Sequence, residues 1–238
     1  VVEEGGTQTG QEVTAQVAEN FLQEKATAGI LCRKTGADIF PVDMGIYRDT
    51  CIRNCKIAYG TKNMAKEPAM TREQAIQGIE TGIMLALEKK KEGYQLLATG
   101  EMGIGNTTTS SAMASVLLHR EPEEVTGRGA GLSTAGLNKK VETIKKAIAM
   151  HKPDPEDPID VLAKVGGFDI AGMIGVYLGG AAAHMPVVID GFISCVAALT
   201  AMRICSTAGD YMIASHVSKE PAAVMLLDAI GKEAFLTC

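Results

Sequence analysis

The sequence has few aromatic residues and no tryptophan: Phe and Tyr together make up 4% of its 238 residues. Proteins that bind single-stranded nucleic acid stack the bases on aromatic side chains, and membrane proteins place Trp and Tyr at the lipid interface. Basic residues are also scarce, because 23 Lys and Arg stand against 28 Asp and Glu, a formal charge of −5. The basic run at 89–91 is predicted to be a solvated helix end. These shortages argue against nucleic acid and membranes as partners.

A long hydrophobic run is missing as well. The longest apolar stretch extends from Ile170 to Ala183, is interrupted by glycines, and is shorter than the roughly 20 residues that cross a bilayer. It is predicted to be a tightly packed interior helix. With 46% hydrophobic residues, the chain is still apolar enough to fold around a large core, as one domain or as a large domain with a small appendage.

Cysteine is sparse and scattered. The six cysteines lie at positions 32, 51, 55, 195, 205 and 238, without the spacing of a disulfide framework, which favours reduced thiols and a cytoplasmic location. Cys51 and Cys55 form the one close pair. Since no second pair or histidine cluster accompanies them, two ordinary thiols are favoured over a zinc site. We predict no metal and no other cofactor.

Capping signals and apolar spacing predict alternating helices and strands. Thr9-x-x-Glu12 and Thr71-x-x-Gln74 are capping-box patterns, which predict helices over about 10–25 and from 71 to about 92. Further helices are predicted to begin near Thr107, Ser133 and Pro158 and to cover about 168–183 and 192–206, and the predicted strands are 39–44, 94–99, 186–189 and 211–213. This alternation predicts an α/β fold with a parallel sheet and helices on both faces.

In such a sheet, ligands bind beyond the carboxyl ends of the strands. Four predicted strands end on polar or glycine-rich residues, at 43–45, 100–106, 190–191 and 215–216. We therefore expect these four segments to line one cleft. Structural roles are the alternative for its members: Asp43 and Asp190 as caps or loop-orienting residues, and His216 as a hydrogen-bonded loop residue.

The segment 100–112 follows a predicted strand and opens a predicted helix. Gly103 and Gly105 allow the backbone to approach a ligand closely, and residues 106–110 supply hydroxyls and N–H groups at a helix N-terminus, whose dipole favours an anion. These features predict a phosphate site. An ordinary strand–turn–helix connection is the alternative, because the spacing matches neither G-x-G-x-x-G nor a P-loop.

In that alternative, Asn106 or Thr107 serves only as the helix N-cap. Glu101 does not suit a simple phosphate cradle, because a carboxylate repels the anion unless it contacts a ribose hydroxyl, a cation or a proton. Its presence suggests catalysis as well as binding.

Four separated motifs resemble, in the same order, the nicotinate-nucleotide–dimethylbenzimidazole phosphoribosyltransferase family. They are GEMGIGNTT at 100–108, the turn at 127–132 followed by NKK at 138–140, KVGGFD at 164–169, and DGF at 190–192. The likeness runs from Glu4 to the C-terminus.

The resemblance implies a Rossmann-like parallel sheet with a smaller helical domain built from the chain ends, and a homodimer. Residues 1–30 are expected in the helical domain and 31–238 in the nucleotide-binding domain. The family's preceding N-terminal portion and its C-terminal helical tail are expected outside this sequence. Its main catalytic base, a glutamate, is expected after Cys238, so that Glu101 is the catalytic carboxylate expected within this sequence.

The resemblance further implies transfer of phosphoribose from nicotinate mononucleotide to 5,6-dimethylbenzimidazole, giving nicotinate and α-ribazole 5′-phosphate with inversion at C1′. A carboxylate would remove the benzimidazole proton while the pyridinium nitrogen leaves, activated by its own charge, so positioning and charge placement carry most of the rate. A related acceptor base is one alternative. A catalytically silent homologue that binds the nucleotide or benzimidazole is the other.

Carried over by position, the motifs also imply the substrate contacts. The ribose phosphate would be held by the loop at 103–107, the turn at 129–132 and a lysine. Two aspartates would lie near the nucleotide. The first helix would approach the benzimidazole through Gln16 or its neighbour Val17. The expected substrate-binding residues are Thr9, Gln16, Gly103, Gly105, Asn106, Thr107, Gly129, Gly131, Leu132, Lys140, Asp169, Asp190 and Ser215.

Overall fold

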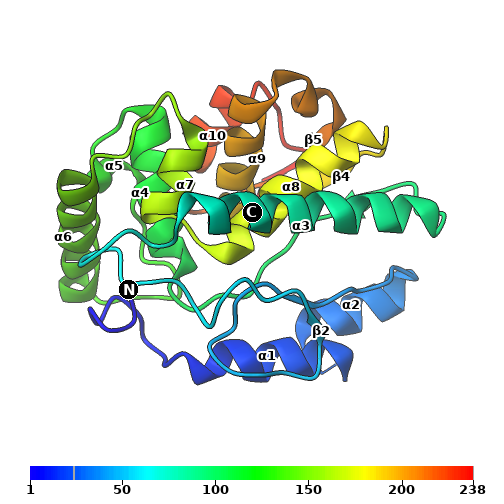
Figure 1. Ribbon diagram of the computed structural model, residues 1–238, viewed down its shortest axis with the longest axis horizontal. Coiled ribbons are helices and arrows are strands. Elements are labelled where there is room, and N and C mark those ends of the chain that lie inside the picture. Colours follow the sequence, from blue (N-terminus) through cyan, green and yellow to red (C-terminus); the bar gives the residue numbers. More distant parts are fainter. Residues whose placement is uncertain (24, 238) are drawn as a thin grey trace.

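The computed structural model describes residues 1–23 and 25–237 (Figure 1). Its helices are α1 (Glu12–Leu22), α2 (Thr27–Thr35), α3 (Arg72–Lys91), α4 (Asn106–Leu118), α5 (Pro122–Val125), α6 (Thr134–His151), α7 (Pro158–Val165), α8 (Phe168–Ala182), α9 (Phe192–Ile204), the 3-10 helix η1 (Ser206–Tyr211) and α10 (Ala223–Ala229). The strands are β1 (Val42–Asp43), β2 (Arg53–Asn54), β3 (Leu97–Ala98), β4 (Val187–Ile189), β5 (Met212–Ala214), β6 (His216–Val217) and β7 (Leu236–Thr237). Among these described residues, no helix has the length and apolarity needed to cross a membrane.

The central sheet consists of three short parallel strands in the order β3-β4-β5. Leu97 pairs with Val187, which pairs in turn with Met212, so the three carboxyl ends lie at the same edge. The parallel sheet is confirmed. Its strands have only two or three residues each, however, and the protein is a mixed α/β fold that is mostly helical with small parallel sheets.

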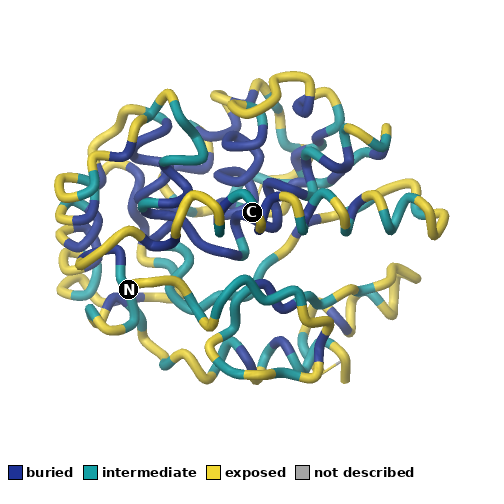
Figure 2. Tube along the Cα trace, in the orientation of Figure 1, coloured by how far each residue is buried: buried dark blue, intermediate teal, exposed yellow. Residues whose placement is uncertain are grey.

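Helices rather than strands supply most of the core, which explains the small sheet. The tightest packing joins α3 to α8, where glycines let the two backbones touch: a Cβ atom at Gly82 would lie 2.1 Å from the Gly172 carbonyl oxygen, and one at Gly175 would lie 2.0 Å from that of Ile79. Figure 2 shows α8 and α9 almost entirely buried. The prediction of a tightly packed glycine-rich interior helix is confirmed.

Asp43 does not reach the edge of the central sheet, because β1 pairs with β2 instead. Its carboxylate accepts hydrogen bonds from the Gly45 and Ile46 N–H groups at 3.1 and 2.8 Å, and from Lys56 Nζ at 2.8 Å. These contacts agree with the loop-orienting interpretation. The prediction that four strand ends share one cleft is wrong for this one.

Two of the predicted helix starts show their capping contacts. Thr71 Oγ1 accepts from the Gln74 N–H group at 3.2 Å while Gln74 Oε1 accepts from the Thr71 N–H group at 3.0 Å, a complete capping box. Ser133 Oγ accepts from the Gly136 N–H group at 3.2 Å.

The capping box predicted at Thr9 is wrong, because Gln11 precedes the first helical residue and no side chain caps α1. The single helix predicted over 10–25 is also too long at its end: α1 stops at Leu22, and a separate helix, α2, follows from Thr27.

Candidate functional site

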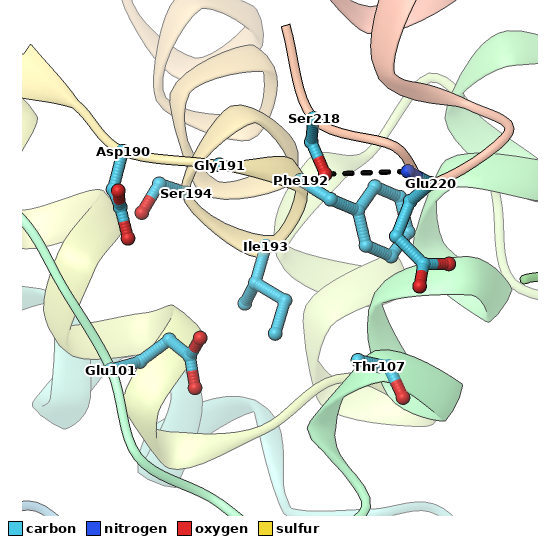
Figure 3. A pocket seen from close by; sticks show the side chains of 9 residues that line it. All are labelled: Glu101, Thr107, Asp190, Gly191, Phe192, Ile193, Ser194, Ser218 and Glu220. Carbon is cyan, nitrogen blue, oxygen red and sulfur yellow. Dashed lines mark hydrogen bonds between the residues drawn. The ribbon is translucent and has the colours of Figure 1, made fainter. Parts of the chain in front are cut away.

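A pocket of about 170 Å³ opens at the carboxyl edge of the central sheet (Figure 3). It collects residues from the loop after β3, the start of α4, the segment between β4 and α9, and the segment after β6. The lining residues are Glu101, Thr107, Asp190, Gly191, Phe192, Ile193, Ser194, Ser218 and Glu220. The pocket therefore lies where the parallel-sheet rule predicts it.

The start of α4 is open toward this pocket. Gly105 precedes the helix with φ +94°, a conformation that favours glycine, and no side chain caps α4. Thr107, in the first turn, lines the pocket. An uncapped helix N-terminus attracts an anion through its N–H groups and dipole, so the predicted phosphate site is geometrically possible here.

Asn106 is not the side-chain cap of α4; its amide joins two carboxylates instead. Asn106 Nδ2 donates to Asp169 Oδ2 at 2.8 Å and also to Glu101 Oε2. Asp169 Oδ1 accepts from the Ile170 N–H group at 2.9 Å, at the start of α8. Asp169 thus lies behind Glu101 and is absent from the pocket lining, whereas Asp190 lines the pocket directly.

This packing changes the acidity of Glu101. Burial, reinforced by the negative charges of Asp169 and Asp190 and only partly opposed by the Asn106 amide, raises the pKa of Glu101 to about 7. Burial raises the pKa of Asp169 as well, again opposed by Asn106. Glu101 can therefore gain or lose a proton near neutral pH, as a general acid or base must.

A buried cation, Lys140, lies behind Thr107 and does not itself line the pocket. Lys140 is 1% exposed, and its Nζ donates to Thr107 Oγ1 at 3.1 Å and to the Gly127 carbonyl at 3.0 Å. Burial lowers the pKa of Lys140, and the Glu220 carboxylate opposes this shift. Gly129 packs against the Lys140 amine and Thr107, and its backbone has a positive φ of +53°. A Cβ atom at Gly129 would lie 2.8 Å from Thr107 Oγ1. Lys140, Thr107 and Gly129 thus form one compact cluster.

Other expected contacts lie at or outside the margin of the pocket. Thr9 and Gln16 are exposed and do not line it, whereas Thr14, which the sequence did not single out, accepts from the Ile104 N–H group at 3.0 Å. The Gly131 carbonyl accepts from the Gln8 side chain. Leu132, the last residue of the turn at 127–132, is buried. The residues of this turn that lie near the pocket are therefore the first ones.

The predicted pocket serine is displaced along the chain. Ser215 does not line the pocket; its Oγ donates to the Asp190 carbonyl at 3.2 Å and lies 2.9 Å from His216 Nδ1. Ser218, three residues on, lines it instead. His216 has a structural, hydrogen-bonded role, as its alternative proposed, but in strand β6 rather than in a loop.

Sequence reasoning missed Ile193 and three polar lining residues, Ser194, Ser218 and Glu220. Ser218 and Glu220 continue the polar segment that follows a predicted strand, which was the available signal. Ser194 lies inside an apolar helix, where it hydrogen-bonds with Thr99 at 3.3 Å, and no local pattern distinguishes it.

Metal ligation finds no support in the geometry. Across residues 1–23 and 25–237, His, Cys, Asp and Glu form no group of three or more that could hold a metal ion. Cys51 and Cys55 are free thiols, one exposed and one partly buried.

Comparisons with known proteins agree with the motifs. A family profile described as Phosphoribosyltransferase matches residues 1–238. The chain is 49% identical over 234 residues to the nicotinate-nucleotide–dimethylbenzimidazole phosphoribosyltransferase of Clostridium tetani and 50% identical over 239 residues to that of Ruminiclostridium cellulolyticum. These alignments cover 97% and 99% of this chain but 65% and 68% of the relatives, so the chain spans about two thirds of their length.

The fold agrees as well. A crystal structure of the enzyme of the same name from Thermus thermophilus superposes with a TM-score of 0.93 at 35% sequence identity, covering 100% of this chain and 72% of that one. Profile, sequence and structure all extend over essentially the whole chain, and we conclude that it belongs to the nicotinate-nucleotide–dimethylbenzimidazole phosphoribosyltransferase family.

Proposed function

We propose that the protein transfers phosphoribose from nicotinate mononucleotide to 5,6-dimethylbenzimidazole, releasing nicotinate and forming α-ribazole 5′-phosphate with inversion at C1′. The observation that carries this proposal is a pocket lined by a proton-exchanging carboxylate, Glu101, and by Thr107, to which the buried Lys140 donates a hydrogen bond, in a chain about half identical to enzymes of that name. The Rossmann-like character of the nucleotide-binding part belongs to the same proposal.

In this proposal, the nucleotide phosphate lies against Lys140, Thr107 and the Gly129 backbone. Lys140 is already held by two hydrogen bonds, so little conformational entropy is lost when it meets the anion. The loop glycines 103 and 105 bring the backbone close to the ribose, and α4 directs its uncapped first turn at the anion.

Glu101 and Asp190 then flank the reacting carbon. Displacement at C1′ develops positive charge on the ribose, which nearby carboxylates stabilise. With its pKa raised to about 7 by burial, Glu101 is partly deprotonated at neutral pH and can exchange a proton during the transfer, beside the separate main base that the family resemblance implies. Asn106 and Asp169 position Glu101 from behind rather than touching the substrate.

The domain arrangement and assembly are further parts of the proposal. In Figure 1, α1, α2 and the β1–β2 segment form a separate lower layer, which supports a helical domain near the start of the chain. Because α2 ends at Thr35 and β2 at Asn54, the proposed boundary to the nucleotide-binding domain lies after β2 rather than at residue 31. We further propose a homodimer, as expected from the family resemblance, and a cytoplasmic location.

Mass spectrometry of a reaction mixture tests the proposed activity. The full-length protein is incubated with nicotinate mononucleotide and 5,6-dimethylbenzimidazole without added metal, and α-ribazole 5′-phosphate is the expected product. Nucleotide binding without any product would favour a silent homologue. Consumption of the nucleotide with unsubstituted benzimidazole or adenine, but not with 5,6-dimethylbenzimidazole, would assign a different acceptor base.

A further inference from the structure

Glu220 occupies the proposed phosphate subsite with an incompletely satisfied carboxylate. Its Oε1 accepts from the Gly129 N–H group at 3.1 Å, whereas its Oε2 is buried without a hydrogen-bond partner among the described residues. The Glu220 N–H group donates to Ser218 Oγ at 3.3 Å, which fixes the backbone at the pocket wall (Figure 3). Buried polar atoms are nearly always hydrogen-bonded, so an unpartnered carboxylate oxygen needs an explanation.

The surroundings of Glu220 are those that a phosphate would need. It accepts the Gly129 N–H group, and its charge acts on the buried Lys140. Its Oε2 also lies so close to Gly127 that a Cβ atom there would come within 1.9 Å. A buried lysine is stabilised by a counter-charge, and the Glu220 carboxylate acts on Lys140 in this sense, because it opposes the lowering of the Lys140 pKa by burial.

A phosphate bound to the same cluster would add a second anion beside this carboxylate. Like charges juxtaposed in a poorly solvated site repel strongly. The phosphate and the Glu220 carboxylate also compete for the Gly129 N–H group. A bound phosphate and the Glu220 carboxylate therefore cannot both take the hydrogen bond that Gly129 donates to Glu220 in this structure.

We propose that Glu220 is a resident counterion that competes with phosphate for the Lys140–Gly129 cluster, so that an anion binds only when the rest of the ligand helps to displace the carboxylate. This inference rests on the proposed phosphate subsite and deepens it. Glu220 thereby discriminates a complete nucleotide from free inorganic phosphate, which lacks the ribose and base contacts. The same repulsion favours release of a phosphate-bearing product.

Calorimetric titration with inorganic phosphate tests the competition. Glu220→Gln removes the charge but keeps an oxygen that can accept from Gly129, and Glu220→Ser is a second neutral variant in case the first does not fold. We expect either folded variant to bind phosphate at least about tenfold more tightly than the unmodified protein, as relief of a like-charge contact predicts. Glu67→Gln, an exposed site with the same change of charge, is the matched control.

A double variant, Lys140→Met with Glu220→Gln, checks that the tighter phosphate binding arises at Lys140. The added change is expected to abolish the gain in phosphate affinity. Unchanged or weaker phosphate binding in a folded neutral variant would overturn the proposal and assign Glu220 a purely supporting role under the turn. Since this titration needs neither an acceptor base nor turnover, its outcome is independent of whether α-ribazole 5′-phosphate is formed.

Discussion

Glu101 owes its proton affinity to its neighbours, since Asn106 and Asp169 hold it in a partly buried position beside a second carboxylate, Asp190. We predict that Glu101→Gln lowers kcat by about 10²-fold or more, the usual contribution of a general acid or base, and changes the KM for nicotinate mononucleotide much less. The amide keeps the shape of the side chain but cannot exchange the proton. Steady-state kinetics at saturating benzimidazole measure both constants.

A pH profile of kcat tests proton exchange by Glu101 separately from any effect of its side chain on the shape of the pocket. Acting as a base, Glu101 must be deprotonated, so we expect log kcat to rise with pH up to about 7 and then to level off. This rising limb should disappear in Glu101→Gln and persist in Glu67→Gln. Equal losses of kcat and nucleotide affinity would instead assign Glu101 to pocket shape alone.

We expect phosphate affinity to depend most on Lys140. Because a charge-assisted hydrogen bond contributes about 1.5–3 kcal/mol, Lys140→Ala is expected to raise the KM for nicotinate mononucleotide by roughly 10- to 100-fold with a smaller change in kcat. The exposed neighbour provides the control, Lys139→Ala. An unchanged KM in a folded Lys140→Ala protein would remove Lys140 from the phosphate subsite.

At the scale of elements, the contact between α3 and α8 holds the molecule together because its glycines carry no side chain. A Cβ atom at Gly82 would lie 2.1 Å from the Gly172 carbonyl oxygen, which belongs to a helix backbone and cannot yield. We therefore predict that Gly82→Ala lowers the free energy of unfolding by about 3 kcal/mol, at the upper end of ordinary overpacking. Urea denaturation measures this change.

The matched control is Gly136→Ala in α6, where the nearest atom to an added Cβ is the end of the Leu132 side chain at 3.2 Å. There the better helix propensity of alanine, about 1 kcal/mol over glycine, offsets the closer contact, so stability should change by less than about 1 kcal/mol. Similar losses in the two variants would show that the cost does not come from the α3–α8 contact.

Helices could be predicted where the residues that determine their starts lie close together in the sequence. Thr71 and Gln74 satisfy each other's backbone groups within one turn, so their capping box forms whatever surrounds it. At the start of α4 the local signal failed, because Asn106 bonds to Asp169, 63 residues away, in preference to capping its own helix. A contact over that distance leaves no pattern in the neighbouring sequence.

At the scale of the whole molecule, the buried position of Glu101 lowers the free energy of unfolding at neutral and alkaline pH. Its pKa is about 7 in the folded protein and near 4.5 when unfolded, so between these values only the folded state keeps the proton. The associated stability is present in full below about pH 4.5 and is lost as pH rises through 7. At 1.36 kcal/mol per unit, the loss is on the order of 2–3 kcal/mol.

Glu101→Gln is therefore expected to gain stability relative to the unmodified protein as pH rises from 5 to 8. Guanidinium unfolding at both pH values provides the comparison, with Glu67→Gln as the control that should show no such gain. A difference that is constant between pH 5 and 8 would contradict a raised pKa for Glu101. Lower activity together with higher stability is common at active sites.

The amino-acid sequence by itself determined the family, the mixed α/β class of the fold and one loop that lines the pocket. The glycines at 103 and 105, Glu101, and the turn before Lys140 are contiguous motifs, and a parallel arrangement of strands follows from their alternation with helices. The strand ends at 100 and 190 could be assigned to one pocket because parallel strands end at one edge.

Only the tertiary structure decided which side chains complete the pocket and what each one does. Asp169 supports Glu101 from behind, Ser218 replaces Ser215 in the lining, Asp43 orients a loop, and Glu220 lines the pocket and accepts from the Gly129 N–H group. The physical reason is that these roles depend on contacts between segments far apart in the chain and on the loss of water around them. Burial raises the pKa of Glu101 and lowers that of Lys140, and burial is a property of the folded whole.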